Sequence, residues 1–190
     1  LMGRTNVDAT HEHDIQLMDQ VARGDRDAMA ELVRKHQAWA VGVAHRLLGD
    51  ASLAEDAVQD ALVKVMRTAD RYRPTARFTT LFYRILVNGC LDLRRSRRRR
   101  KASAIHDDAV IARVDPAEPI HRTERAAAIR RAINRLPERQ RTAVILSRFD
   151  GKSHVQIREI TGWSRSAVES LLVRAYAQLR HWLKDYAEDA

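Results

Sequence analysis

Residues 151–180 read GKSHVQIREITGWSRSAVESLLVRAYAQLR, and this stretch decides the fold. Ser153 and Gln156 have the spacing of a capping box, in which each side chain satisfies a backbone amide at a helix start. Thr161 to Ser164 supply a four-residue turn with a glycine, between a short helix and a longer one. This layout predicts a helix-turn-helix.

The longer helix of this pair, from Ser164 to about Asp185, separates apolar from polar side chains. Its polar side has short side chains near the N-terminus, as a helix that enters the major groove of duplex DNA requires. An arginine there can contact guanine or phosphate, and Glu169 can accept from a cytosine amine. From this segment alone, an amphipathic hairpin with a solvated face stays an alternative. The candidate DNA-reading residues are Arg165, Ser166, Glu169, Ser170, Val173 and Arg174.

The composition of the whole chain favours an all-α fold. Of its 190 residues, 45% are hydrophobic and 31% are charged, which disfavours disorder and membrane embedding; 7 Gly and 4 Pro leave little punctuation for many strands. Ser52 and Glu55 have the spacing of a second capping box, at the start of a helix. Beside the helix-turn-helix, hydrophobic periodicity predicts helices over about 14–23, 25–48, 52–70, 78–100, 120–135 and 138–150.

Two small domains are expected. Residues 1–12 lack periodicity and are interpreted as a disordered lead. An N-terminal domain then covers 13–101 and a C-terminal domain, with the helix-turn-helix, covers 120–190. Between them, residues 102–119 contain two prolines and four acidic residues and lack a helical pattern, which indicates a flexible acidic linker.

The charge distribution indicates a polyanionic partner. The formal net charge is +9, and much of it lies in one basic run, 94–101, although such a run can also be a plain solvated segment. No stretch approaches the roughly 20 apolar residues that a membrane span requires, and the first residues lack an apolar signal core. The single Cys90 fits a reducing compartment. We therefore expect no membrane insertion and a cytoplasmic location.

Two further helices have faces of distinct character. Opposite its apolar stripe, the helix over 52–70 carries carboxylates around Val63, which suits a protein partner with a basic surface better than DNA, with a solvated face as the alternative. The helix over 78–100 places aromatic residues before its basic end, and aromatic rings beside cations hold unstacked bases at about 1–3 kcal/mol each. Phe78 and Phe82 are expected in the core, whereas Tyr83 and Asn88 are less committed to it.

Four phrases, in this order, make the chain resemble a bacterial sigma factor of the extracytoplasmic-function (ECF) class. The resemblance covers about 14–186. The phrases are AEDAVQDAL at 54–62, FTTLFYRILVN at 78–88 with DLRR at 92–95, LPERQR at 136–141, and the stretch 151–180.

This resemblance implies a factor that binds core RNA polymerase, through the clamp helices of the β′ subunit and through the β subunit. The first domain would open the promoter minus-10 element, and the second would read the minus-35 element as duplex. Members of the family are commonly controlled by an anti-sigma factor. By position, the polymerase-binding residues would be Glu55, Asp56, Gln59, Asp60 and Val63. The minus-10 residues would be Tyr83, Arg84, Asn88, Asp92, Arg95, Arg97 and Arg98.

Three residues depart from the pattern of the family. Leu81 stands where a tryptophan is usual, Arg158 where a small residue lets the two reader helices approach, and Thr161 where an aliphatic residue is usual. Either the Arg158 stem extends outward or the helix pair is splayed.

The predicted function is that of a dissociable transcription initiation factor without catalysis, cofactor or metal. The histidines are scattered, and His36 and His45 are expected to be surface or packing residues. No Ser/His/Asp set or phosphate-binding glycine loop occurs in the sequence. The alternative is a stand-alone helix-turn-helix regulator that binds palindromic duplex DNA as a dimer, with the N-terminal block used for dimerisation.

Overall fold

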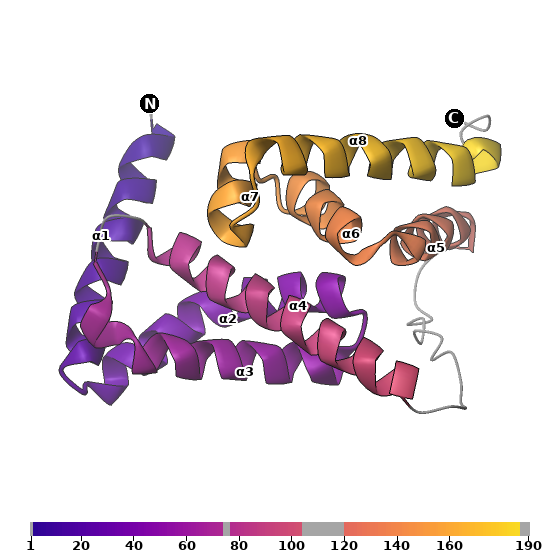
Figure 1. Cartoon of the computed structure of the whole chain (residues 1–190). Coiled ribbons are helices and arrows are strands. Elements are labelled where there is room, and N and C mark those ends of the chain that lie inside the picture. The colour runs from indigo at the N-terminus through magenta and orange to yellow at the C-terminus, as the bar shows by residue number, and fades with distance from the viewer. Residues whose placement is uncertain (1, 74–76, 104–119, 187–190) are drawn as a thin grey trace. The chain divides into compact units, whose positions relative to one another are not determined.

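The structure is a computed structural model and describes residues 2–73, 77–103 and 120–186. Within these ranges the regular secondary structure is helical and contains no strand, which confirms the all-α prediction. The helices group into two compact units, α1 to α4 and α5 to η3 (Figure 1). The predicted linker lies outside the described residues, except for Ala102 and Ser103, which belong to the end of α4.

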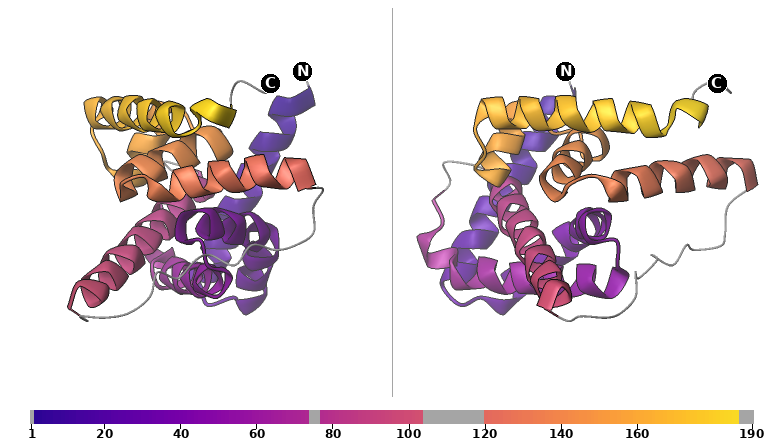
Figure 2. Two further views of the ribbon diagram at one scale, coloured as in Figure 1. Left: turned by 90° about the vertical axis from the view of Figure 1, so that its right-hand side faces the viewer. Right: turned by 45° about the vertical axis from the view of Figure 1, so that its right-hand side comes forward.

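The first unit is built around α2. This helix contacts α3, α4 and α1, and the views in Figure 2 show α3 and α4 crossing beside it. The bounds of the elements are Met2–Ala22 for α1, Arg26–Leu48 for α2, Ala51–Arg67 for α3, Ala69–Arg71 for the 3-10 turn η1, and Phe78–Ser103 for α4.

Local capping sets the ends of α2. Asp25 accepts hydrogen bonds from the amides of Asp27 and Ala28 at 2.8 and 3.1 Å, so the carboxylate satisfies amides that have no partner within the helix. At the other end Gly49 has a φ of 73°, which a residue with a Cβ rarely adopts, and its amide donates to the carbonyl of His45. The predicted start and end of this helix are confirmed.

The start of α3 differs from the prediction. Asp50, not Ser52, caps the helix, and its carboxylate accepts from the amide of Leu53 at 3.1 Å. Asp50 follows Gly49 directly in an extended conformation and thus already has N-cap geometry, and a carboxylate is favoured at the positive end of a helix. Ser52 lies inside the first turn, so the prediction of a capping box from Ser52 to Glu55 was wrong.

The start of α1 also differs. The sequence predicted a disordered lead over 1–12, but the helix begins at Met2, so this prediction was wrong for 2–12. A contact with α2 reaches back into this segment, because Lys35 Nζ donates to the carbonyl of Thr10 at 3.3 Å; His13, just after the segment, places Nε2 2.5 Å from Oε1 of Glu31. Once a helix is nucleated, each added residue gains one hydrogen bond for one residue fixed, whereas nucleation fixes about three residues for one bond, so a packed helix can extend into a segment without apolar periodicity.

The core of the first unit is aromatic. Phe78 and Phe82 of α4 are fully buried, as predicted, and their rings lie 5.8 Å apart. Trp39 of α2 packs edge-on to Phe82 at 5.3 Å and stacks on Tyr83 at 4.7 Å. Burial of each phenylalanine contributes about 1.5–3 kcal/mol, so this cluster fixes the position of α4 on α2.

The second unit places the helix-turn-helix on a small helical base. Helix α6 packs along α8, α7 also contacts α8, and the side chains of Leu146, Ile157 and Val168 are fully buried. The bounds are Ile120–Arg135 for α5, Glu138–Val144 for α6, Ile145–Phe149 for the π-helical turn η2, His154–Thr161 for α7, Arg165–Trp182 for α8, and Lys184–Tyr186 for the 3-10 turn η3.

Candidate functional site

The turn between α7 and α8 has the predicted geometry. Ser153 Oγ accepts from the amide of Gln156 at 3.3 Å, and Gln156 Oε1 accepts from the amide of Ser153 at 2.9 Å, which confirms the capping box. Gly162 has a φ of 73°, and Ser164 caps α8 by accepting from the amide of Ala167 at 3.2 Å. Backbone conformation and side-chain caps thus both stop α7 and start α8, and the helix-turn-helix is confirmed.

An outward side chain accommodates the departure at 158, and hydrogen bonds accommodate the one at 161. Arg158 is exposed, while Ile157 and Ile160 beside it are buried. Thr161 is half-buried, and its hydroxyl donates to the carbonyl of Ile157 at 2.6 Å and accepts from the amide of Trp163 at 3.3 Å. The hydroxyl is therefore satisfied where the family has an aliphatic side chain, and the first of the two alternatives, an outward arginine, is the one that occurs.

The candidate minus-35 residues lie on one face of α8. Val173 has 69% of its surface exposed, although Leu172 next to it is buried, so the helix presents an apolar side chain to solvent on its polar side. Glu169 is half-exposed, and the remaining members of this set are exposed: Arg165, Ser166, Ser170 and Arg174. An exposed valine among hydrogen-bonding groups is suited to a thymine methyl group in the major groove.

Polar contacts organise this face. Arg165 Nε donates to Glu169 Oε1 at 2.8 Å, and this hydrogen bond lowers the pKa of Glu169. Arg174 Nη2 donates to Ser170 Oγ at 2.8 Å, and its Nε donates to the carbonyl of the same residue at 3.2 Å. The two arginines are thus held by partners of different charge.

The candidate polymerase-binding residues lie on the exposed side of α3. Val63 is 40% exposed, and the carboxylates and amide around it are exposed: Glu55, Asp56, Gln59 and Asp60. Met66, one turn after Val63, is 51% exposed and extends the apolar part of this face; sequence reasoning missed it, although the spacing of three residues from Val63 was a usable signal. We call these six residues the α3 face.

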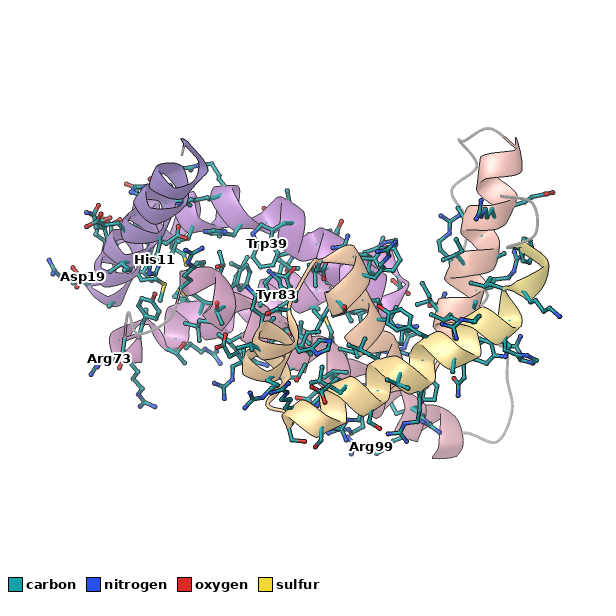
Figure 3. The ribbon with its side chains drawn as sticks, turned by 90° about the horizontal axis from the view of Figure 1, so that it is seen from above. His11, Asp19, Trp39, Arg73, Tyr83 and Arg99 are labelled. Atoms are coloured by element: carbon teal, nitrogen blue, oxygen red, sulfur yellow. The ribbon has the colours of Figure 1, made fainter. Side chains whose placement is uncertain are left out.

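The candidate minus-10 residues divide into two sets. Tyr83 is buried and its ring is stacked on Trp39 with an interplanar angle of 15°, so that side of the ring is covered by protein (Figure 3). Arg97 lies on the same side of α4 and approaches Asp50 at 3.9 Å. The other residues follow helical spacing along a different side of α4, and we call them the α4 stripe; Asn88 is half-buried and the rest are exposed: Arg84, Asn88, Asp92, Arg95 and Arg98.

A shallow groove of about 320 Å³ separates α3 from α4. Asp60 of the α3 face and Asp92 of the α4 stripe both line it, and its lining also includes Ala57, Ala61 and Gly89, whose side chains are small or absent. The two candidate sites of the first unit therefore share a boundary.

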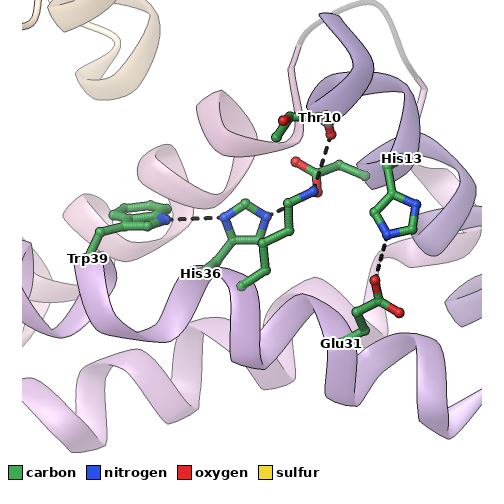
Figure 4. A network of polar contacts seen from close by, with 7 residues as sticks. Thr10, His13, Glu31, His36 and Trp39 are labelled. Atoms are coloured by element: carbon green, nitrogen blue, oxygen red, sulfur yellow. Dashed lines mark hydrogen bonds and ion pairs between the residues drawn. The ribbon is translucent and has the colours of Figure 1, made fainter. Parts of the chain in front are cut away.

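A buried polar network joins α1 to α2, and sequence reasoning missed it (Figure 4). Asp14 and His36 are 2% and 4% exposed, and His36 Nε2 lies 3.1 Å from Asp14 Oδ1. Lys35 Nζ also donates to this oxygen, at 2.6 Å, and Trp39 Nε1 donates to His36 Nδ1 at 3.1 Å. His36 was expected to be a surface or packing residue; it packs, and it also links the core tryptophan to a carboxylate.

Three further features concern the described part of the chain: clusters of metal ligands, helices that could span a membrane, and the thiol of Cys90. There, no three His, Cys, Asp or Glu side chains gather as metal ligands would, and no helix is long and apolar enough to cross a bilayer. Cys90 is buried, and burial raises the pKa of its thiol to about 12.

The chain is similar to sigma factors in sequence. The family models for Sigma-70 region 2 and Sigma-70 region 4 match residues 32–100 and 126–179. The RNA polymerase sigma-H factor of Pseudomonas aeruginosa is 32% identical over 176 residues, which cover 87% of this chain and 91% of that one. The ECF RNA polymerase sigma factor SigM of Mycobacterium tuberculosis is 34% identical over 175 residues, which cover 91% of this chain and 86% of that one.

Two solved structures share the fold. The structure of CnrH in complex with the cytosolic domain of CnrY has a TM-score of 0.66 and 24% identity, and the match covers 91% of this chain and 98% of that one. The sigma factor RpoE of Bartonella quintana, in complex with the anti-sigma factor NepR, has a TM-score of 0.65 and 23% identity, and the match covers 82% and 96%.

Proposed function

The chain belongs to the extracytoplasmic-function (ECF) sigma factors, and from this membership we propose how its two units share the work of transcription initiation. It is a promoter-specific initiation factor, and its partners are core RNA polymerase and promoter DNA. The stand-alone dimeric regulator is not favoured, because both matched regions are those of sigma factors.

We propose that the α3 face docks on the clamp helices of the polymerase β′ subunit. The observation that supports this assignment is an exposed apolar pair, Val63 and Met66, flanked by carboxylates in a chain of net charge +9. An acidic surface is repelled by DNA but attracted to a basic protein surface, and exposed apolar side chains gain free energy only when a partner covers them. Contacts to the β subunit are expected in addition.

The α4 stripe is proposed to hold the melted minus-10 strand. Asn88 can donate and accept hydrogen bonds on the edge of an unstacked base, and Arg84, Arg95 and Arg98 can neutralise its phosphates. Because the ring of Tyr83 already stacks on Trp39, we propose that Tyr83 holds α4 in place against α2 and does not stack on a base. Asp92 lines the groove between α3 and α4 and therefore lies where the α4 stripe meets the α3 face.

The exposed face of α8 is proposed to read the minus-35 element as duplex. Its N-terminal residues would contact base edges, since the N-terminal end of a recognition helix enters the groove most deeply. The chain needs no catalysis or cofactor for this work, because binding free energy for exposed bases offsets the cost of unstacking them.

The chain is proposed to act in the cytoplasm, where core polymerase works, and to be controlled by an anti-sigma factor. Of the two structures that share its fold, CnrH is in complex with the cytosolic domain of CnrY, and RpoE is in complex with the anti-sigma factor NepR. An anti-sigma factor that covers the α3 face would block polymerase directly.

Reconstituted transcription tests this function. The purified chain plus core RNA polymerase should give discrete transcripts from a genomic template, and neither component alone should do so. Asp60→Lys should abolish them by reversing a charge on the α3 face, whereas Glu124→Lys, an equal charge change at an exposed site on α5, should not. If the wild-type chain gave no promoter-specific transcript on any genomic template, the function would be disproved.

A further inference from the structure

An ion pair lies on the exposed face of α8, within its first two turns. Arg165 is the first residue of the helix, and its Nε lies 2.8 Å from Oε1 of Glu169. The two side chains are 78% and 44% exposed. Exposed pairs of this kind contribute little to folding stability, so stabilisation of the helix does not explain why an acid is placed on a surface that must approach DNA.

The nitrogen that Glu169 engages determines what Arg165 can still do. A guanidinium carries five N–H groups in a rigid planar fork, and Glu169 accepts from the single one on Nε. Among the residues that the structure describes, no other acceptor is seen for Arg165, so the N–H groups on its two Nη atoms remain for a ligand. Guanine offers two acceptors, O6 and N7, that match this pair of nitrogens.

Arg174 provides an internal comparison on the same face. Its Nη2 and Nε both donate to neutral oxygens of Ser170, so the guanidinium group lies against the preceding turn of its own helix. An arginine held in this way presents charge to a phosphate rather than a free fork to a base. Arg165 and Arg174 are therefore prepared for different ligands.

We propose that Glu169 is a positioning residue that holds the Arg165 guanidinium so that Arg165 selects guanine at one base pair of the promoter element bound by α8. This inference rests on the proposed function, in which α8 enters the major groove. Glu169 acts through Arg165 and does not itself contact the base. A carboxylate so placed lowers the general attraction to DNA, because it repels phosphates, and raises the selectivity of the arginine that it orients.

When Glu169 is replaced, affinity for DNA of any sequence should therefore rise, while the preference for guanine at one base pair should fall. The experiment uses holoenzyme, reconstituted from the full chain and core polymerase, on a promoter library randomised over the minus-35 element. Wild type should prefer guanine at one position by roughly 5- to 150-fold, the range for a bidentate arginine contact. Glu169→Ala should lose most of this preference while binding unrelated duplex more tightly, because it removes both the acceptor that holds Arg165 and a negative charge.

Variants at 165 separate charge from geometry. Arg165→Lys keeps the charge but has no Nε for Glu169 to hold, so it should lose the guanine preference as Arg165→Ala does. In the Arg165→Ala background, Glu169→Ala should cause no further change in base preference. Asp19→Asn is the matched control, because it removes an exposed pair of the same spacing, with Arg23 of α1, and should leave the base preference unchanged.

The outcomes are distinct. If Glu169→Ala left the guanine preference intact, or changed a cytosine preference independently of Arg165, the positioning role would be wrong while the proposed function stood. If wild-type holoenzyme showed promoter-specific initiation without any base preference in the minus-35 element, both the reader role of α8 and this inference would be overturned. Circular dichroism of each variant, with the helical signal of wild type retained, shows that α8 still forms.

Discussion

At the level of single residues, Asp14 is a buried carboxylate held by two donors of α2. Lys35 Nζ and His36 Nε2 both approach the same oxygen, and Trp39 extends the network into the aromatic core. A buried carboxylate without partners would be strongly destabilising, so this network stabilises the contact between α1 and α2 only while Asp14 is ionised.

The pH dependence of stability should report Asp14. Burial alone would raise its pKa, but the hydrogen bonds from His36 and Lys35 outweigh burial and lower the pKa below 3.8. A group with a lowered pKa stabilises the fold above the pKa of the unfolded chain, and this contribution is lost as pH falls through the folded pKa. Asp14→Asn should reduce the free energy of unfolding by about 1–3 kcal/mol at pH 7, and the difference should shrink below pH 3.8.

Urea denaturation at a series of pH values measures this effect. Asp19→Asn, which removes an exposed partner of Arg23, is the control and should change stability by less than about 1 kcal/mol at every pH. Parallel curves for wild type and Asp14→Asn down to pH 3 would show that the network contributes nothing through ionisation.

Cys90 gives a second prediction at this scale. Because burial raises the pKa of the thiol to about 12, almost no thiolate exists at pH 8, and the side chain is also shielded. Iodoacetamide should therefore fail to alkylate the native protein and should label it fully in denaturant, as measured by mass spectrometry. Rapid labelling under native conditions would mean that α4 leaves the core easily.

At the level of the helices, the sequence predicted several ends that are set locally, but it named Ser52 instead of Asp50 as the cap of α3 and missed the start of α1. Gly49 ends α2 at the predicted position, and Ser153 forms the capping box that its spacing to Gln156 predicted; both act within a few residues of themselves. Lys35 of α2 contacts α1 at Thr10, and the ring of Tyr83 stacks on Trp39 of α2. No periodicity within one helix reveals a partner that lies on another helix.

The candidate site residues were likewise predictable where helical periodicity alone decides which side chains are exposed. Residues on the α3 face and on α8 were predictable because a helix with one apolar side must expose the other. Arg97 was assigned with its neighbours in the basic run, but helical geometry turns it to the other side of α4, toward Asp50. The contact of Arg165 with Glu169 could be anticipated from their spacing, yet the nitrogen engaged could not.

The α3 face gives a prediction for the element as a unit. Met66→Ser should weaken the binding of the chain to core polymerase roughly tenfold, because truncation of an apolar interface residue costs about 1.4 kcal/mol. Fluorescence anisotropy of a labelled chain titrated with core enzyme measures this affinity. Val155→Ser removes an equally exposed apolar side chain from α7 and is the control. Equal affinities for wild type and Met66→Ser would place the polymerase contact elsewhere.

At the level of the whole molecule, the chain combines an acidic face on α3 with basic residues on α4 and α8. Ionic strength should therefore change its affinity for two partners, core polymerase and DNA. Binding to core polymerase and binding to DNA should both weaken as salt rises, but only the second releases the counterions condensed on DNA. The salt dependence of promoter binding by preformed holoenzyme therefore isolates the DNA-binding cations from the α3 face.

Within the basic run, the structure separates cations by their protein contacts. All three arginines at 97–99 are exposed, but Arg97 lies 3.9 Å from Asp50, whereas no acidic partner is seen for Arg98 or Arg99 among the described residues. Arg98→Ala combined with Arg99→Ala should flatten the slope of log affinity against log salt by about 0.7–0.9 for each phosphate that the chain no longer neutralises, equally for all promoter sequences. Arg97→Ala alone should change the salt slope less.

A control double variant replaces Arg26 and Arg34, two exposed cations of α2, with alanine. It alters the net charge equally and should leave the slope unchanged, since the slope reports phosphates neutralised rather than total charge. If both double variants flattened the slope alike, the basic run would act through net charge alone, and the assignment of α4 to the promoter strand would lose its electrostatic support.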